Sequence, residues 1–409
     1  MYSLLAAKTR GLEAEALEFT QQLIRTASPS SQEGEVARLV EQRMESLGYE
    51  DVSVDDYGNV IGVLPGREGQ PTVLLCSHMD TAEAGEPAAW QESPLSGEVR
   101  DGVLYGLGAS DCKAGLAAQL YAGALLRRAM LPRKGNIVVA ATVSEEQGGS
   151  PGLRRLMQDT LPSMDLRPDY AILGEPTELG IYYGQDGSAV FEVLIEGRDN
   201  FQVSDATTAV FESLHNQYRP AGSGEQAEFQ SLCSPRFQQR AESVSGVIGV
   251  CRRLSDTQTI GGAMEQIKHE ARAAAASVAH VAVDVTVRRE ERQLYTKRST
   301  LLEQRIDAWS LDPYHPLIMR ARHALAAAGC DVSCGKFRLP RLGMGTAGGV
   351  LSNQFNVPAI AYGPGSEDTC HGPNESVSVA RASRAIYGTA AIVHSLVGVP
   401  VCGWTLDEI

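Results

Sequence analysis

Residues 72–81 read TVLLCSHMDT, a largely apolar run that turns abruptly polar. The apolar part, 72–76, does not alternate with polar residues, which is typical of a strand buried on both faces of a parallel sheet. His78 and Asp80 follow at the point where this strand should end. Because open parallel sheets place their sites at the carboxyl ends of strands, the stretch predicts both the class of fold and the edge that carries the site.

Helix-period and strand-period segments alternate around this run through the first 180 residues. Apolar side chains spaced three and four residues apart predict amphipathic helices, and Gly48 is placed to end the second of them in a left-handed cap. The alternation is typical of an α/β domain with a mostly parallel sheet flanked by helices. The predicted helices span 11–26, 33–46, 113–128 and 152–159, and the predicted strands span 52–54, 60–64, 72–76, 136–143 and 170–173.

The pattern changes from about residue 184 to residue 298, and then the earlier style returns. We therefore expect residues 1–183 and 299–409 to form one domain, with 184–298 as an α+β domain inserted into it. The insertion reads as a strand at 189–197, a helix at 207–217, an alanine-rich run and a strand at 280–288, and the later segments are a helix at 316–327, a strand at 357–361 and a helix at 380–396.

Composition and charge exclude several classes of function. The chain is 43% hydrophobic and 21% charged, as soluble globular proteins are. Its net charge of -14 would repel a phosphate backbone, so we expect no nucleic-acid partner. No apolar run reaches the ~18 residues of a membrane span, and no secretory segment opens the chain, so we expect no membrane partner. The eight cysteines form no C-x-x-C pair, which fits a reducing cytoplasm.

Five polar clusters follow or adjoin segments that look buried. Each cluster alone has an ordinary explanation: Asp111 could be a helix N-cap, and His371 a loop histidine without a function. Together they supply two histidines and several carboxylates, the ligands that zinc takes in sites with open coordination positions. The clusters are CSHMDTAEAG at 76–85, DGVLYGLGASDCKAG at 101–115, TVSEEQGGSPG at 142–152, LGEPTE at 173–178 and DTCHGPNE at 368–375.

The paired carboxylates of Glu145 and Glu146 are the most informative of these residues. Adjacent carboxylates repel each other, and a bound cation resolves the repulsion: one side chain ligates it while the other takes a proton from water. Asp80, two residues from His78, could orient the imidazole ring. Other chemistries fit less well. The glycine-rich run before Asp111 lacks the third glycine of a dinucleotide loop, and nothing specifies a histidine-paired cysteine nucleophile.

In their order, HMDT, DGVLYGLGASDCKAG, SEEQGG, GEPT and HGPNE resemble the motifs of the co-catalytic zinc peptidases and deacylases, which include acetylornithine deacetylase, succinyl-diaminopimelate desuccinylase, aminoacylase and glutamate carboxypeptidase. The resemblance covers residues 10–190 and 310–400. It implies a zinc-exopeptidase-like catalytic domain that hydrolyses an amide of a small N-acyl amino acid or dipeptide-like substrate.

The resemblance also implies roles for individual residues. His78, Asp111 and Glu175 would hold one zinc, and Asp111, Glu146 and His371 the other; cobalt or manganese could replace zinc at such ligands. Glu145 would move the proton, and Asp80 would orient His78. The inserted domain would be a lid that also makes homodimers.

The lid departs from the resemblance. The family usually has a histidine shortly after the lid's first strand, where it helps to stabilise the oxyanion, and here Phe201 lies near that position. The lid passage after Gly261 and Gly262 lacks the usual Asn and Pro, and Leu107 replaces a usual Arg. The lid histidines that could substitute are His215, His269 and His280. These differences leave an alternative: a non-catalytic or repurposed zinc-binding homologue whose lid binds a ligand or partner.

Overall fold

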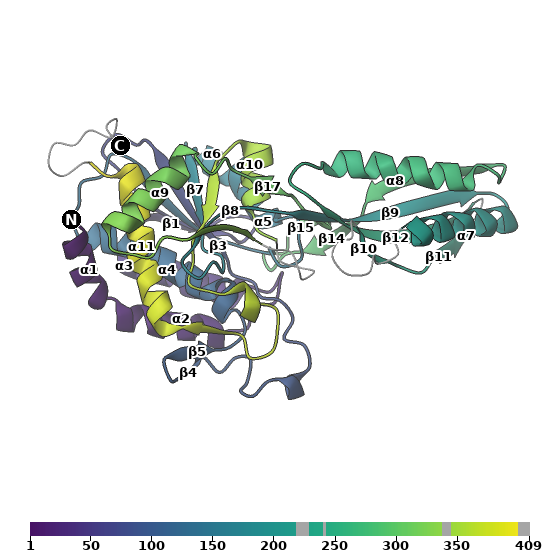
Figure 1. Cartoon of the computed structure of the whole chain (residues 1–409). Coiled ribbons are helices and arrows are strands. Elements are labelled where there is room, and N and C mark those ends of the chain that lie inside the picture. The colour runs from purple at the N-terminus through teal and green to yellow at the C-terminus, as the bar shows by residue number, and fades with distance from the viewer. Residues whose placement is uncertain (218–228, 240–242, 338–344, 400–409) are drawn as a thin grey trace.

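The computed structural model describes residues 1–217, 229–239, 243–337 and 345–399. Figure 1 shows a larger body that holds the amino-terminal helices and a long arm that projects from it. The body is built on a nine-stranded sheet, and the arm on a six-stranded sheet with two helices.

The nine-stranded sheet has the order β1-β2-β6-β3-β7-β19-β8-β17, with β18 beside β8. Its centre is parallel, because β6, β3, β7 and β19 all run in one direction. Most pairs at its margins are antiparallel. The strands are β1 (Glu50–Val54), β2 (Val60–Leu64), β3 (Thr72–His78), β6 (Asn136–Thr142), β7 (Tyr170–Leu173), β8 (Ile181–Gln185), β17 (Trp309–Ser310), β18 (Cys334–Phe337) and β19 (Ala359–Ala361).

Helices cover both faces of this sheet, which explains why β3 is apolar throughout. Val73 and Leu75 point into the core beneath one helical layer, whereas Leu74 and Cys76 point into the core on the other face. The first layer contains α1 (Tyr2–Arg10), α2 (Glu13–Arg25), α3 (Gly34–Leu47), α4 (Ala114–Arg128), α9 (Pro316–Ala327) and α11 (Val379–Val397), and the second contains α5 (Pro151–Arg155), the helical turns that follow it up to α6 (Leu161–Ser163), and α10 (Gly348–Phe355).

The arm has a core of its own. Alternate residues of β9 (Gly187–Gly197) and β12 (Val244–Leu254), such as Phe191 and Ile248, pack against α7 (Asn200–Gln217) and α8 (Ile260–Ala275). The other strands of this sheet are β10 (Phe229–Leu232), β11 (Arg236–Gln239), β13 (Val281–Val287) and β16 (Arg305–Ile306).

Two small sheets lie apart from these. The hairpin of β14 (Arg289–Gln293) and β15 (Ser299–Glu303) reaches the larger body, where the Tyr295 hydroxyl donates to the main-chain oxygen of Gly58 at 2.9 Å. The three-stranded sheet contains β4 (Glu98–Arg100), β5 (Val103–Tyr105) and β20 (Ser376–Ser378), and it joins the loop before α4 to the loop before α11.

The predicted α/β class with a parallel core and flanking helices is confirmed, and Gly48 ends α3 in the left-handed conformation. The antiparallel margins and the strand β12 were not predicted. The chain leaves the large sheet after β8 and rejoins it at β17, while the hairpin β14–β15 packs on the larger body. The division at residues 184 and 298 stays a prediction. Among the described residues, no helix combines the length and apolar character that crossing a bilayer requires.

Candidate metal centre

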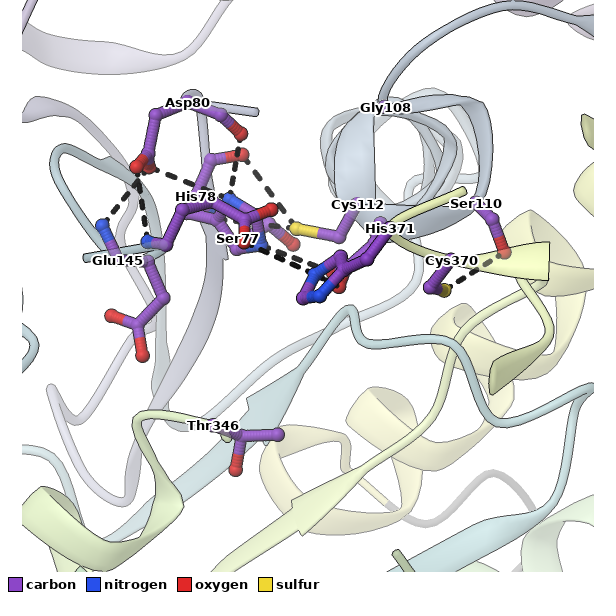
Figure 2. Close-up of polar contacts among 12 residues, drawn as sticks. Ser77, His78, Asp80, Gly108, Ser110, Cys112, Glu145, Thr346, Cys370 and His371 are labelled. Carbon is purple, nitrogen blue, oxygen red and sulfur yellow. Dashed lines mark hydrogen bonds and ion pairs between the residues drawn. The ribbon is translucent and has the colours of Figure 1, made fainter. Parts of the chain in front are cut away.

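The structure brings all seven predicted site residues to one edge of the large sheet. His78 is the last residue of β3, Glu145 and Glu146 follow β6, and Glu175 follows β7. Because these strands are parallel, their carboxyl ends lie side by side. Asp80 and His371 come from loops, and Asp111 comes from the irregular helical turn before α4. Figure 2 shows His371 facing the His78 region from a separate segment.

Asp111 stands between the two histidines. Its Oδ1 lies 3.1 Å from Nε2 of His78, and its Oδ2 lies 3.1 Å from Nε2 of His371. It precedes α4 in an irregular turn, and that helix receives no side-chain cap, so the N-cap explanation for Asp111 does not hold. A carboxylate that presents one oxygen to each of two imidazoles has the arrangement expected of a bridging ligand.

Two groups of potential ligands share Asp111. One contains Asp111, Glu146 and His371, with Oε2 of Glu146 3.1 Å from Nε2 of His371. The other contains His78, Asp111 and Glu175 together with Cys112, and within each group the ligand atoms lie within 4.8 Å of one another. These two sets match the two predicted triads, apart from the additional thiol.

Cys112 was not predicted as a neighbour of the site. Its Sγ accepts from the main-chain N–H of His78 at 3.3 Å, and burial raises the pKa of its thiol to about 12. A neutral thiol held against the backbone supports the strand end on which His78 sits. The clue in the sequence was its position directly after Asp111.

Asp80 organises the edge of the site through its main chain and its side chain. Its main-chain oxygen lies 2.9 Å from Nδ1 of His78, nearer than its carboxylate, whose Oδ1 lies at 3.5 Å. The carboxylate accepts from the main-chain N–H groups of Glu145 and Glu146, both at 3.0 Å, and from the Ser30 hydroxyl at 2.6 Å. Asp80 therefore positions the main chain of both glutamates as well as the ring of His78, and Figure 2 shows its contacts with Glu145 and His78.

Glu145 has one oxygen engaged and one without a partner. Oε1 accepts from the Ser150 hydroxyl at 2.8 Å, whereas Oε2 is buried and no described residue donates to it. Burial raises the pKa of Glu145 to about 7. A carboxylate with a raised pKa and one oxygen without a described partner is suited to proton transfer, and Glu145 is among the residues that line a pocket.

Ser150 belongs to a stretch, GGSPG at 148–152, that matches the G-x-S-x-G spacing of serine hydrolases. A serine nucleophile at this position would need a histidine hydrogen-bonded to its hydroxyl. The hydroxyl of Ser150 donates to Glu145, and within the described residues no hydrogen bond joins it to a histidine. The histidine that a serine nucleophile requires is therefore not in place.

The charges of the site fit a cation. Burial and the nearby charge of Asp111 raise the pKa of Glu175 well above its ordinary value, and burial also raises the pKa of Glu146. Burial favours a neutral Asp111, but hydrogen bonds to His371 and His78 outweigh it and lower its pKa. Buried carboxylates this close repel each other, and cations bound between them would relieve the repulsion. The donor set of imidazole and carboxylate suits zinc, and also cobalt or manganese.

A pocket opens above these residues between the body and the arm. The described arm contributes Ser188, Val190 and Cys251 to its wall, and the segment that returns from the arm contributes Arg305. None of the three lid histidines is among the described lining residues: His215, His269 and His280 are exposed elsewhere on the arm. Phe201 is 82% exposed on α7.

The sequence pattern of peptidase family M20/M25/M40 matches residues 74–395 of the chain. Among curated relatives, the uncharacterized protein YgeY of Escherichia coli K12 is 24% identical over 393 residues, 91% of this chain and 92% of its own length. Succinyl-diaminopimelate desuccinylase 2 of Ruegeria sp. TM1040 is 32% identical over 165 residues, 40% of this chain and 41% of its own.

A solved structure shares the fold over nearly the whole chain. It is the YXEP protein of Bacillus subtilis, described as a dinuclear metal-binding peptidase, which superposes with a TM-score of 0.65 at 15% sequence identity. The match covers 94% of this chain and 98% of that chain. The likeness extends across both the body and the arm.

Proposed function

This chain belongs to peptidase family M20/M25/M40, and on that premise we propose that it is a metal-dependent amidohydrolase with a dinuclear centre. The proposed ligands are His78, Asp111 and Glu175 for one metal, and Asp111, Glu146 and His371 for the other. Zinc is the metal we propose, with cobalt or manganese as possible replacements. The YXEP protein of B. subtilis is described as a dinuclear metal-binding peptidase, which supports two metals per chain.

A single observation carries the proposal: each carboxylate oxygen of Asp111 lies 3.1 Å from a different imidazole, and each imidazole belongs to a separate ligand group. A structural aspartate needs no such arrangement. A carboxylate shared in this way would hold one cation at each of its oxygens.

The chain's own residues would perform the proton transfers. Two bound cations would supply a polarised substrate carbonyl and an acidified water. Glu145, whose Oε2 has no described partner, is placed to accept a proton from water and to return it to the leaving amine. Ser150 holds the other oxygen of Glu145, and Asp80 holds its main chain, so the carboxylate keeps one orientation.

We propose a small N-acyl amino acid or a dipeptide-like amide as the substrate. The desuccinylase relative acts, by its name, on an acylated amino acid, and the relative from B. subtilis is a peptidase. The pocket also holds Arg305, a donor suited to a substrate carboxylate, although it already pairs with Glu303 at 3.1 Å. A cytoplasmic location and a homodimer formed through the arm complete the proposal.

Hydrolysis of a panel of N-acyl amino acids and dipeptides tests the proposed function. The protein should be loaded with zinc, cobalt or manganese and compared with Glu145→Gln at equal metal content. Turnover by the wild type and its loss in the variant are expected. If both proteins are inert while both bind two metals, the alternative of a repurposed homologue replaces the enzyme.

A further inference from the structure

A buried carboxylate outside the proposed ligand set lies between two of the loops that carry ligands. Glu375 is in the same loop as His371, directly before β20, and is 2% exposed. The resemblance quoted above contains this residue within HGPNE but gives it no role. Its contacts decide what it does.

Glu375 accepts hydrogen bonds from three main-chain N–H groups of the loop that ends at Asp111. Its Oε1 accepts from Ser110 at 2.8 Å and from Asp111 at 2.9 Å, and its Oε2 accepts from Gly108 at 2.8 Å. Its main-chain oxygen accepts from a fourth N–H, that of Gly106, at 2.9 Å. One residue thus holds the backbone of most of the turn that leads into α4.

Among the described residues, this carboxylate accepts hydrogen bonds from main-chain N–H groups and not from a side-chain cation. The nearby ammonium group of Lys113 is also buried, but it donates to the main-chain oxygens of Leu23 at 2.8 Å and Thr26 at 3.0 Å. Because all three donors belong to one short loop, their combined effect is to fix the conformation of that loop.

We propose that Glu375 is a positioning residue of the metal centre: it holds the backbone of residues 108–111 so that the two oxygens of Asp111 face His78 and His371. It also joins the loop of Asp111 to the loop of His371, because it belongs to the second and binds the first. The inference rests on the dinuclear site of the proposed function, but not on any hydrolytic activity.

The variant Glu375→Gln tests this role with little change in size. In this variant an NH₂ group replaces one of the two carboxylate oxygens. The main-chain N–H groups that donate to that oxygen, either that of Gly108 or those of Ser110 and Asp111, would then lose their acceptor. Groups that orient metal ligands typically contribute 10- to 100-fold to metal affinity. We expect at least one zinc equivalent to bind at least tenfold more weakly in a competition titration with a chelator, and the absorption spectrum of the cobalt-loaded protein to change.

Asp55→Asn is the matched control. Asp55 is also partly buried and accepts main-chain N–H groups, from Tyr57 and Asn59 at 2.9 Å each, but in a loop that supplies no proposed ligand. Both variants should lose thermal stability, and only Glu375→Gln should lose metal affinity. Wild-type metal affinity and a wild-type cobalt spectrum in Glu375→Gln would overturn the proposal.

A measurement on the wild type covers the case in which Glu375→Gln does not fold. Hydrogen exchange of the amides of Gly108, Ser110 and Asp111 should be slow both with metal and after its removal, because the carboxylate holds them. If these amides are protected only when metal is bound, the metal and not Glu375 orders the loop. The two proposals can fail separately. If the wild type hydrolyses no substrate but Glu375→Gln still binds metal more weakly than the wild type, only the proposed function is contradicted.

Discussion

At the scale of single residues, Glu145 and Glu146 are neighbours with different surroundings. Glu146 contacts His371 at 3.1 Å, whereas Glu145 contacts Ser150 and leaves Oε2 without a described partner. The two side chains therefore fit the two different roles, metal ligand and proton acceptor, that the sequence predicts for the pair. One has the position of a ligand, and the other has the position of a proton carrier.

Glu145→Gln should abolish most turnover without removing metal. The amide cannot take a proton from water, and general acid–base groups contribute roughly 10²- to 10⁴-fold to rate. Steady-state kinetics on the best substrate of the panel, with metal content measured in parallel, checks this. The control is Glu178→Gln, which alters an exposed glutamate paired with Arg381. Equal loss of rate in both variants would argue against a specific role of Glu145.

His371→Ala should lower the metal content towards one equivalent per chain. The substitution removes the only imidazole of the Asp111, Glu146 and His371 group and leaves the other group complete. Elemental analysis after dialysis measures the ratio. His323→Ala, at an exposed histidine of α9, is the matched control and should retain two equivalents. Two tightly held metals in His371→Ala would show that the ligand assignment is wrong.

At the scale of elements, α4 packs against the end of β7 so closely that only glycine fits. A Cβ on Gly115 would lie 1.7 Å from the main-chain oxygen of Gly174, the residue before Glu175. Gly115→Ala should cost about 1–3 kcal/mol of stability, as overpacking does, and should weaken metal binding by displacing Glu175. Urea denaturation and a metal titration measure the two effects.

The control for this prediction is Gly261→Ala on the helix α8. A Cβ on Gly261 would meet nothing within 4 Å, so alanine should stabilise that helix by about 0.5–1 kcal/mol. Opposite signs of the stability change in the two variants are expected. A Gly115→Ala protein as stable as the wild type would mean that α4 and the Gly174 loop are less tightly packed than the structure shows.

The helix α11 contains a buried histidine that makes stability depend on pH. Burial, followed by the charge of Arg133, lowers the pKa of His394 to about 4, against about 6.5 in an unfolded chain. Below the unfolded value the unfolded chain binds a proton that the folded protein does not bind. The contribution of His394 to stability is therefore complete above about pH 6.5 and falls as the pH drops towards 4.

We expect the free energy of unfolding to fall by about 2 kcal/mol because of this histidine when the pH drops from 7 to 5. Denaturation of the wild type and of His394→Gln at both pH values isolates its share, because the other titrating groups are common to the two proteins. The wild type should lose more stability than the variant over this interval. Parallel losses would show that His394 titrates normally in the folded protein.

At the scale of the whole molecule, the sequence predicted the features that depend on local patterns, such as buried strands and the polar residues at their ends. The apolar run 72–76 and the polar residues after it were enough to predict a buried strand and a site at its carboxyl end. Beyond the metal ligands that the resemblance places together, the sequence did not predict contacts between distant segments. Glu375 holds the main chain of Asp111 across 264 residues, and Tyr295 reaches Gly58 across 237. Such pairings depend on the assembled fold and leave no periodic signal in either segment.

The five sequence motifs lie outside the arm, so they predict the role of the arm less directly than that of the metal centre. If it forms homodimers as proposed, sedimentation velocity of the full chain should show a species of about twice 43.8 kDa at micromolar concentration. The open face and edge of its sheet would be the place of contact. A single species of monomer mass at every concentration would contradict the dimer and leave the metal centre unaffected.

A crystal structure of the zinc-loaded protein, solved with anomalous diffraction, tests directly whether Asp111 bridges two metals. We expect two anomalous peaks about 3.5 to 4 Å apart, each within bonding distance of a different oxygen of Asp111. One peak should adjoin His78 and Glu175, and the other Glu146 and His371. A single peak, or two peaks of which neither contacts Asp111, would show that Asp111 is not a bridging ligand.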